Sequence, residues 1–137
     1  MASRREARIL AIQALYSWDV TGTTPEELLE FRWRKEEWSD QELLFPAILV
    51  RGTIEQIERV DETIRRNLTG WTFERLQLVD RAILRVATYE LLFQKEIPAS
   101  VAINEAVEIA KDYSSDDAYR FVNGVLDGVW TEVGRSA

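Results

Sequence analysis

The chain has 137 residues, 46% of them hydrophobic, and its 17 basic and 24 acidic side chains give a net charge of −7. It contains neither cysteine nor histidine, which excludes disulfides, thiolate zinc sites and every catalytic arrangement that uses a cysteine nucleophile or an imidazole. The longest apolar run, residues 43–50, is much shorter than the about 18 residues that a membrane helix needs, so we expect a cytoplasmic protein without a membrane span.

Helix signals begin at the start of the chain. Ser3 and Glu6 have the spacing of a capping box, which predicts a helix over about residues 4–20, ended by Gly22. The next start signal is residues 24–27, a capping threonine followed by proline and two acids.

Further helix signals continue to the end of the chain, and no stretch alternates apolar and polar residues as a strand does. Ser39 and Glu42 repeat the capping box and predict a long helix to about residue 66, which Pro46 could bend early. The remaining expected elements are one short turn over residues 72–77 and helices over residues 78–94, 100–113 and 116–133. The sequence therefore predicts one all-α domain over residues 1–137.

Positive charge is concentrated at the start of the chain. Residues 1–18 contain Arg4, Arg5 and Arg8 against one glutamate, a net charge of +2, and the rest of the chain contains 14 basic and 23 acidic side chains, a net charge of −9. Single-stranded nucleic acid binds surfaces that combine cations for its phosphates with aromatic rings for its bases. The basic helix start therefore predicts an RNA contact, and the acidic remainder favours a basic protein partner.

The first helix has apolar residues on two opposite faces. One face includes Leu15 and is typical of a core, and the other combines Arg5, Ile12 and Tyr16, with Arg8 on its flank. Two interpretations stay open at this point. Either the helix is packed on both sides, or Tyr16 stacks on bases from an open surface while Arg5 and Arg8 bind phosphates.

Weaker signals occur elsewhere. Trp33 stands among basic residues that acids follow at once, which favours a solvated helix face. Gly124 costs its helix roughly 1 kcal/mol relative to alanine, and close approach of another helix backbone would compensate. Residues 115–120 combine helix-start amides with a ring and a guanidinium, although by themselves they are typical of a capped terminus. Adjacent acid pairs point about 100° apart on a helix and do not converge on a substrate, so catalysis is not expected.

A second group of basic residues lies late in the long helix. The sequence most simply pairs these residues with acids of the same helix. The expected partners of Arg59, Arg65 and Arg66 are Glu55, Glu58 and Asp61.

Three stretches together resemble the NusB family of transcription antitermination factors. The first is the arginine-bearing segment RREARILAIQALY, residues 4–16. The second is DRAILRVATYEL, residues 80–91, and the third is IPASVAINEAV, residues 97–107, which continues into FVNGVLD at residues 121–127. The resemblance covers essentially the whole chain.

This resemblance implies an all-α fold of about seven helices in two three-helix subdomains packed across one another, with no catalysis, cofactor or metal. Family members bind the boxA segment of ribosomal RNA leader transcripts together with NusE, a ribosomal small-subunit protein, and the pair joins the elongating RNA polymerase and suppresses premature termination. By resemblance, the NusE contact corresponds to Asp80 and Arg81. The RNA contacts correspond to Arg4, Arg5, Arg8, Gln13, Tyr16, Asp117, Arg120 and Phe121.

Two alternatives remain beside this assignment. One is a protein-interaction module that forms a homodimer through its first helix without RNA, because Ile9 and Ile12 lie beside Tyr16. The other is the free-standing equivalent of the RNA-binding domain of a ribosomal RNA methyltransferase, since the same domain occurs at the front of RNA cytosine methyltransferases. We expect a free-standing factor, because no catalytic domain follows in this sequence.

Overall fold

Helices and the turns between them make up the part of the chain that the structure describes. The computed structural model describes residues 2–136 and the side chains of residues 2–134. The expected domain, residues 1–137, extends one residue beyond the described residues at each end. The helices are α1 (Arg4–Thr21), α2 (Pro25–Leu28), α3 (Leu44–Glu55), α4 (Ile57–Arg66), the 3-10 helix η1 (Phe73–Arg75), α5 (Leu78–Phe93), α6 (Ala99–Tyr113) and α7 (Ala118–Ser136). The prediction of an all-α fold is confirmed.

The boundaries of α1 are set by its caps, as the sequence predicts. The backbone N–H of Glu6 donates to Ser3 Oγ at 3.1 Å, and the N–H of Ser3 donates to Glu6 Oε1 at 2.9 Å. At the other end Gly22 adopts the left-handed conformation (φ 71°), and its N–H donates to the carbonyl of Trp18. Because glycine has no Cβ, it adopts this conformation at little cost, and the helix stops there.

The long helix expected up to residue 66 is interrupted. The capping box of Ser39 and Glu42 is present, but it is followed by turns over residues 40–43, so α3 begins only at Leu44. A second break falls at Gln56, where the backbone leaves the helical region (φ −106°, ψ 22°) and α4 begins. The bend changes the direction of the chain between α3, which packs on α1 and α5, and α4, which packs on α5 and α7. Pro46, which the sequence marked as the point of bending, lies in the first turn of α3.

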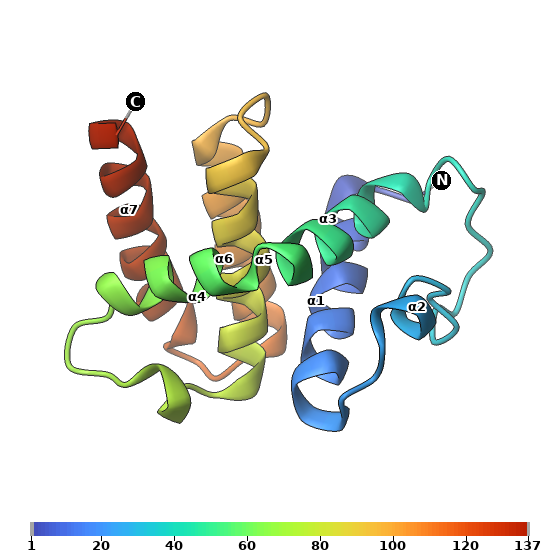
Figure 1. Ribbon diagram of the computed structural model, residues 1–137, viewed down its shortest axis with the longest axis horizontal. Helices are drawn as coiled ribbons and strands as arrows, with labels where there is room; N and C mark the ends of the chain where they lie inside the picture. Colours follow the sequence, from blue (N-terminus) through green and yellow to red (C-terminus); the bar gives the residue numbers. More distant parts are fainter. Residues whose placement is uncertain (1, 137) are drawn as a thin grey trace.

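Helix α5 is the centre of the molecule. It packs against α1, α3, α4, α6 and α7, and residues 82–92 are buried around its whole circumference. Helices α1 to α3 form one group beside it and α6 and α7 another, with α4 crossing in front of α5 (Figure 1). The expected arrangement of two helical subdomains packed across one another is confirmed. None of the helices within residues 2–136 is both long enough and apolar enough to cross a membrane.

The close contact with another helix that was expected at Gly124 is absent, and a different glycine, Gly52, makes one. No atom of another element lies within 4 Å of the position that a Cβ on Gly124 would occupy, so that prediction is wrong. A Cβ on Gly52 would instead lie 2.1 Å from the Cζ and Oη atoms of Tyr89. Gly52 is therefore the residue that lets α3 approach α5.

A network of buried charges joins three helices. Asp19 of α1 accepts from Arg81 of α5, with 2.8 Å between Oδ2 and Nη2, and lies 3.3 Å from the Nη1 atom of Arg85. Arg85 also donates to both carboxylate oxygens of Asp61 on α4, each at 2.9 Å. Because these four side chains are largely withdrawn from water, the network fixes the relative positions of α1, α4 and α5.

Candidate nucleic-acid interface

The basic start of α1 exposes two of its three arginines. Arg4 is exposed, and its guanidinium carbon lies 4.0 Å from the centroid of the Phe45 ring. Arg5 is also exposed, and its Nη2 and Nε atoms donate to Glu105 Oε2 of α6 at 2.5 and 2.9 Å. The hydrogen bond and charge of Glu105 raise the pKa of Arg5. Both cations are therefore within reach of a ligand in solvent.

Arg8 does not share this exposure. It is 3% exposed, and its guanidinium donates three hydrogen bonds of 2.8–3.1 Å to the carboxylate of Glu90 on α5. Burial raises the pKa of Glu90, and the hydrogen bonds from Arg8 oppose that rise. The expectation that Arg8 offers its guanidinium to phosphates from the surface is wrong, because the side chain is turned inward to pair with a buried carboxylate.

The second apolar face of α1 is covered in its middle and open at its end. Ile12 is 8% exposed, whereas Tyr16 is 38% exposed. Gln13 lies beside Tyr16 on the surface, and its Oε1 accepts a hydrogen bond of 3.0 Å from the indole Nε1 of Trp33. The helix is therefore packed on both sides at Ile12 and open to solvent at Tyr16.

Tyr16 lies on the wall of a groove of about 410 Å³ between α1 and the ends of two other helices. We call it the α1 groove. Its wall is mainly apolar and contains three aromatic rings. The lining residues are Ile9, Ile12, Gln13, Tyr16, Ser17, Trp33, Val79, Ile109 and Tyr113.

Two of these rings were not predicted from the sequence. Trp33 belongs to an irregular segment between α2 and α3, so the prediction of a solvated helix face is wrong for it. Tyr113, the last residue of α6, is 53% exposed. The mixture of Trp33 with basic neighbours was a signal for the first ring. No local signal exists for the second, because Tyr113 lies at helical spacing among core residues.

A second groove, of about 270 Å³, lies at the start of α7. Asp117 and Phe121 are on its wall, and Phe121 packs edge-on against Trp71 with 5.7 Å between ring centroids. Arg120 is exposed, and its Nε donates to the hydroxyl of Tyr119 at 3.0 Å. The structure thus brings two of the expected RNA-contacting residues, Asp117 just before α7 and Phe121 in its first turn, together around an aromatic pair, and Arg120 is exposed in that turn.

The two residues expected to contact a protein partner are largely buried. Asp80 is 6% exposed at the second groove and accepts a hydrogen bond of 2.6 Å from Ser114 Oγ. Burial raises the pKa of Asp80, and the bond from Ser114 opposes that rise. Arg81 is held by Asp19. Both side chains therefore position this end of α5, and a partner at this end would meet exposed neighbours such as Trp71.

The two grooves are adjacent, and together with the α1 start they form one strip. Val79 lines the first groove and Asp80 lines the second, and both belong to the first turn of α5. The strip runs along α1 from Arg5 to Tyr16, passes the start of α5 and ends at the start of α7. It combines exposed cations with aromatic rings. Among the described residues, no three or more carboxylates are grouped so that they could hold a metal ion.

Comparisons with known proteins give a consistent result. The family model described as the NusB family matches residues 5–130. The transcription antitermination protein NusB of Treponema pallidum (strain Nichols) is 52% identical over 128 residues, which cover 92% of this chain and 91% of the relative. The protein of the same name from Bacillus cereus (strain ATCC 14579) is 46% identical over 127 residues, covering 92% of this chain and 95% of the relative.

Solved structures are similar over nearly the whole length. Thermotoga maritima NusB has a TM-score of 0.86 at 37% identity, covering 96% of this chain and 92% of the other. A chain in the crystal structure of antitermination factors NusB and NusE in complex with double-stranded RNA has a TM-score of 0.85 at 32% identity. That match covers 94% of this chain and 96% of the other.

Proposed function

The chain belongs to the NusB family of transcription antitermination proteins, which are not enzymes, and from this premise we propose that it binds boxA-type RNA of ribosomal RNA leader transcripts together with the ribosomal protein NusE. The resulting complex joins the elongating RNA polymerase. In this role the chain is an adaptor: it holds RNA and a protein at once and changes neither covalently.

The strip from Arg5 to Phe121 is the observation that carries the RNA assignment. Single-stranded RNA needs cations spaced along its backbone and ring faces for its bases, and base stacking on aromatic side chains contributes about 1–3 kcal/mol per base. Arg4 and Arg5 supply charge at one end of the strip, and Tyr16 supplies an exposed ring in its middle. At the other end Phe121 borders the second groove, of about 270 Å³.

The arrangement favours weak RNA binding by this chain in isolation. Two exposed arginines that neutralise phosphates give a slope of about −1.4 in log K against log salt for a single strand. Arg8 acts indirectly, because it fixes the start of α1 against α5 through Glu90. Gln13 and Asp117 offer polar groups beside the rings, and Arg120 offers one further cation.

A basic partner fits the rest of the molecule. Outside residues 1–18 the chain carries 14 basic and 23 acidic side chains, a net charge of −9, which attracts a cationic protein. A relative has been crystallised with NusE and double-stranded RNA, which supports NusE as the partner. We place the NusE contact near Asp80 and Arg81, on the exposed residues around them. A second protein that also contacts the RNA would raise the affinity of the assembly by making part of the binding intramolecular.

The test compares RNA binding by the native chain and by Arg4→Ala/Arg5→Ala, with and without NusE and over a range of salt concentrations. We expect the variant to bind boxA RNA more weakly and to lose about 1.4 from the salt slope, because each lost phosphate contact removes about 0.7. Arg32→Ala/Arg51→Ala removes the same charge from exposed positions outside the strip and serves as the control. Equal RNA binding by both double variants would show that the strip is not the RNA site.

Self-association through the α1 groove is a second candidate function, favoured by its apolar lining and by the exposure of Tyr16 and Tyr113. A homodimer that covers this groove would compete with RNA. Sedimentation with and without boxA RNA separates the two functions. A dimer whose mass and stability do not respond to RNA supports self-association, and a monomer that takes up RNA excludes it.

A further inference from the structure

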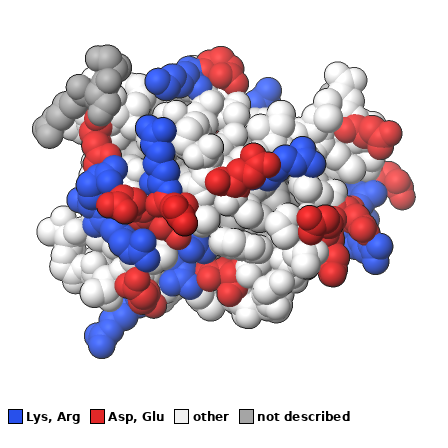
Figure 2. All heavy atoms as spheres, viewed as in Figure 1, with Lys and Arg blue, Asp and Glu red and all other residues white. Residues whose placement is uncertain are grey.

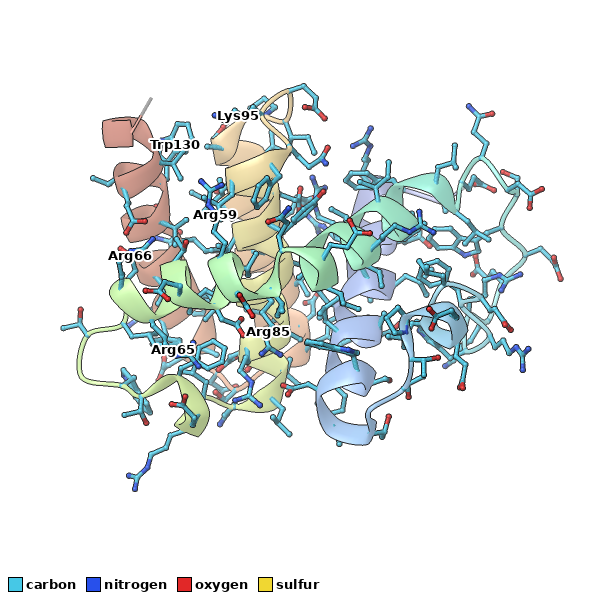
Figure 3. The ribbon with its side chains drawn as sticks, in the orientation of Figure 1. Arg59, Arg65, Arg66, Arg85, Lys95 and Trp130 are labelled. Atoms are coloured by element: carbon cyan, nitrogen blue, oxygen red, sulfur yellow. The ribbon has the colours of Figure 1, made fainter. Side chains whose placement is uncertain are left out.

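A small cationic pocket lies between α4, the end of α5 and α7, away from the strip described above. It has a volume of about 230 Å³. We call it the α4–α7 pocket. Figure 3 shows three of its cations and the nearby Trp130 on this part of the molecule, and Figure 2 shows Lys and Arg side chains gathered there among a few acids. Its lining residues are Arg59, Thr63, Arg66, Leu92, Lys95, Glu132 and Val133.

The charges of this pocket do not cancel. Among the lining residues, three are cationic and only Glu132 is acidic. Glu132 accepts from Arg66 at 2.7 Å and from the side-chain amide of Asn67 at 3.3 Å, so its charge is matched by that of Arg66. Arg59 and Lys95 have no ion pair with any side chain of residues 2–134. The pairing of Arg59 with acids of its own helix, expected from the sequence, is therefore not found.

Two of the three cationic side chains of the pocket have contacts within the protein. Arg66 is fixed by Glu132, lies 3.7 Å from Glu62 and donates to Thr63 Oγ1 at 3.3 Å. The guanidinium carbon of Arg59 lies 5.1 Å from the centroid of the Phe93 ring. A cation–π contact uses the face of a guanidinium and leaves its N–H groups available as donors. The pocket thus offers the donors of Arg59 and Lys95 to an anion.

An aromatic ring stands next to this pocket. Trp130 precedes Val133 by three residues on α7, so the two side chains lie on the same helix face, and Trp130 is 46% exposed. Arginine and lysine bind phosphate through charge-assisted hydrogen bonds, and exposed rings bind bases by stacking. We propose that the α4–α7 pocket binds the phosphate of a nucleotide, whose base stacks on Trp130. This site is independent of the strip along α1.

The nucleotide can belong to an RNA strand or be free in solution, and the test separates these sources. The indole N–H resonance of Trp130 and the backbone amide of Lys95 are followed by NMR during titration with inorganic phosphate, adenosine monophosphate and a short single-stranded RNA. The RNA titration uses the Arg4→Ala/Arg5→Ala background, which removes cations of the α1 strip. Adenosine monophosphate should bind at least about fivefold more tightly than inorganic phosphate, because its base adds a stacking contact.

The matched variants are Arg59→Ala/Lys95→Ala and the control Arg32→Ala/Arg51→Ala, which remove equal charge from exposed positions. Adenosine monophosphate should cause no chemical-shift changes in Arg59→Ala/Lys95→Ala and the native changes in the control variant. Shifts with RNA assign the site to an RNA strand, and shifts with adenosine monophosphate alone assign it to a free nucleotide. The proposal is overturned by a lack of shifts with all three probes, by equal binding of both double variants, or by equal affinity for inorganic phosphate and the monophosphate.

Discussion

Arg4, Arg5 and Arg8 lie within five positions of the sequence, but Arg8 is buried whereas Arg4 and Arg5 are exposed. The partner of Arg8 is Glu90, which is 82 positions away in the sequence, and only the packing of α1 on α5 brings the two together. The local pattern therefore predicts a basic helix start but cannot tell which arginine turns inward. The exposed pair, Arg4 and Arg5, was predictable because a charged side chain at a helix start is normally solvated.

The first prediction concerns Arg8→Ala, which leaves the carboxylate of Glu90 buried without its partner. We expect the free energy of unfolding to fall by about 3–5 kcal/mol at neutral pH. Burial raises the pKa of Glu90 above its value in the unfolded chain, and a carboxyl group with a raised pKa destabilises the fold as the pH rises through that value. The loss relative to the native chain should thus be smaller in mildly acidic buffer.

Chemical denaturation at the two pH values measures this loss. Arg8→Ala/Glu90→Leu removes both charges and should recover part of the stability, since no charge is then left buried without its partner. An equal loss at both pH values would contradict the account, because it would mean that Glu90 does not titrate in the variant.

At the scale of the helices, local signals placed most boundaries within a few residues. The caps of α1 and the starts of α2 and α5 follow directly from the sequence. The break at Gln56 does not, because no glycine, proline or capping residue marks it and the bend serves the packing of α3 and α4 on different neighbours. Close approach at Gly52 was missed for the same reason, since its cause is Tyr89 of another helix.

Two glycines provide a matched test of these contacts. Gly52→Ala places a methyl group where Tyr89 stands, and we expect a loss of about 1–3 kcal/mol in the free energy of unfolding from overpacking. Gly124→Ala meets no atom of another element within 4 Å and should stabilise α7 by about 1 kcal/mol, because alanine is the better helix former. Thermal unfolding of both variants measures these effects. The two variants should change the free energy of unfolding in opposite directions. Destabilisation by Gly124→Ala would mean that another backbone does approach α7.

At the scale of the whole molecule, the sequence predicts the fold class and the family but not how the surface is assembled. Strings such as FVNGVLD identify the helical scaffold through their resemblance to the family. The α1 groove, in contrast, needs Tyr16, Trp33 and Tyr113 from three separate segments, and their convergence depends on the packing of α1, α5 and α6. The α4–α7 pocket depends in the same way on elements that are distant in the sequence.

The buried charge network gives a prediction for the packing of α1 against α4 and α5. Asp19→Ala deprives Arg81 and Arg85 of a carboxylate, and we expect a loss of about 3 kcal/mol in the free energy of unfolding. Because Asp19 belongs to α1 and its partners to α5, hydrogen exchange should speed up in α1 more than in α6. Glu37→Ala, at an exposed position, is the control. An equal increase of the hydrogen-exchange rate in all helices would contradict a role of Asp19 in packing α1 against α5.

The contact between Arg5 and Glu105 has a consequence for selectivity. In the RNA site that we propose, the carboxylate of Glu105 occupies the place on Arg5 where a phosphate would bind, so an incoming polyanion would have to displace it. A strand that makes few additional contacts would gain little binding free energy from this exchange. A strand whose bases also stack on the rings of the strip would gain enough to offset the lost ion pair between Arg5 and Glu105. In this proposed site, Glu105 would therefore weaken the binding of polyanions whose bases do not fit the rings.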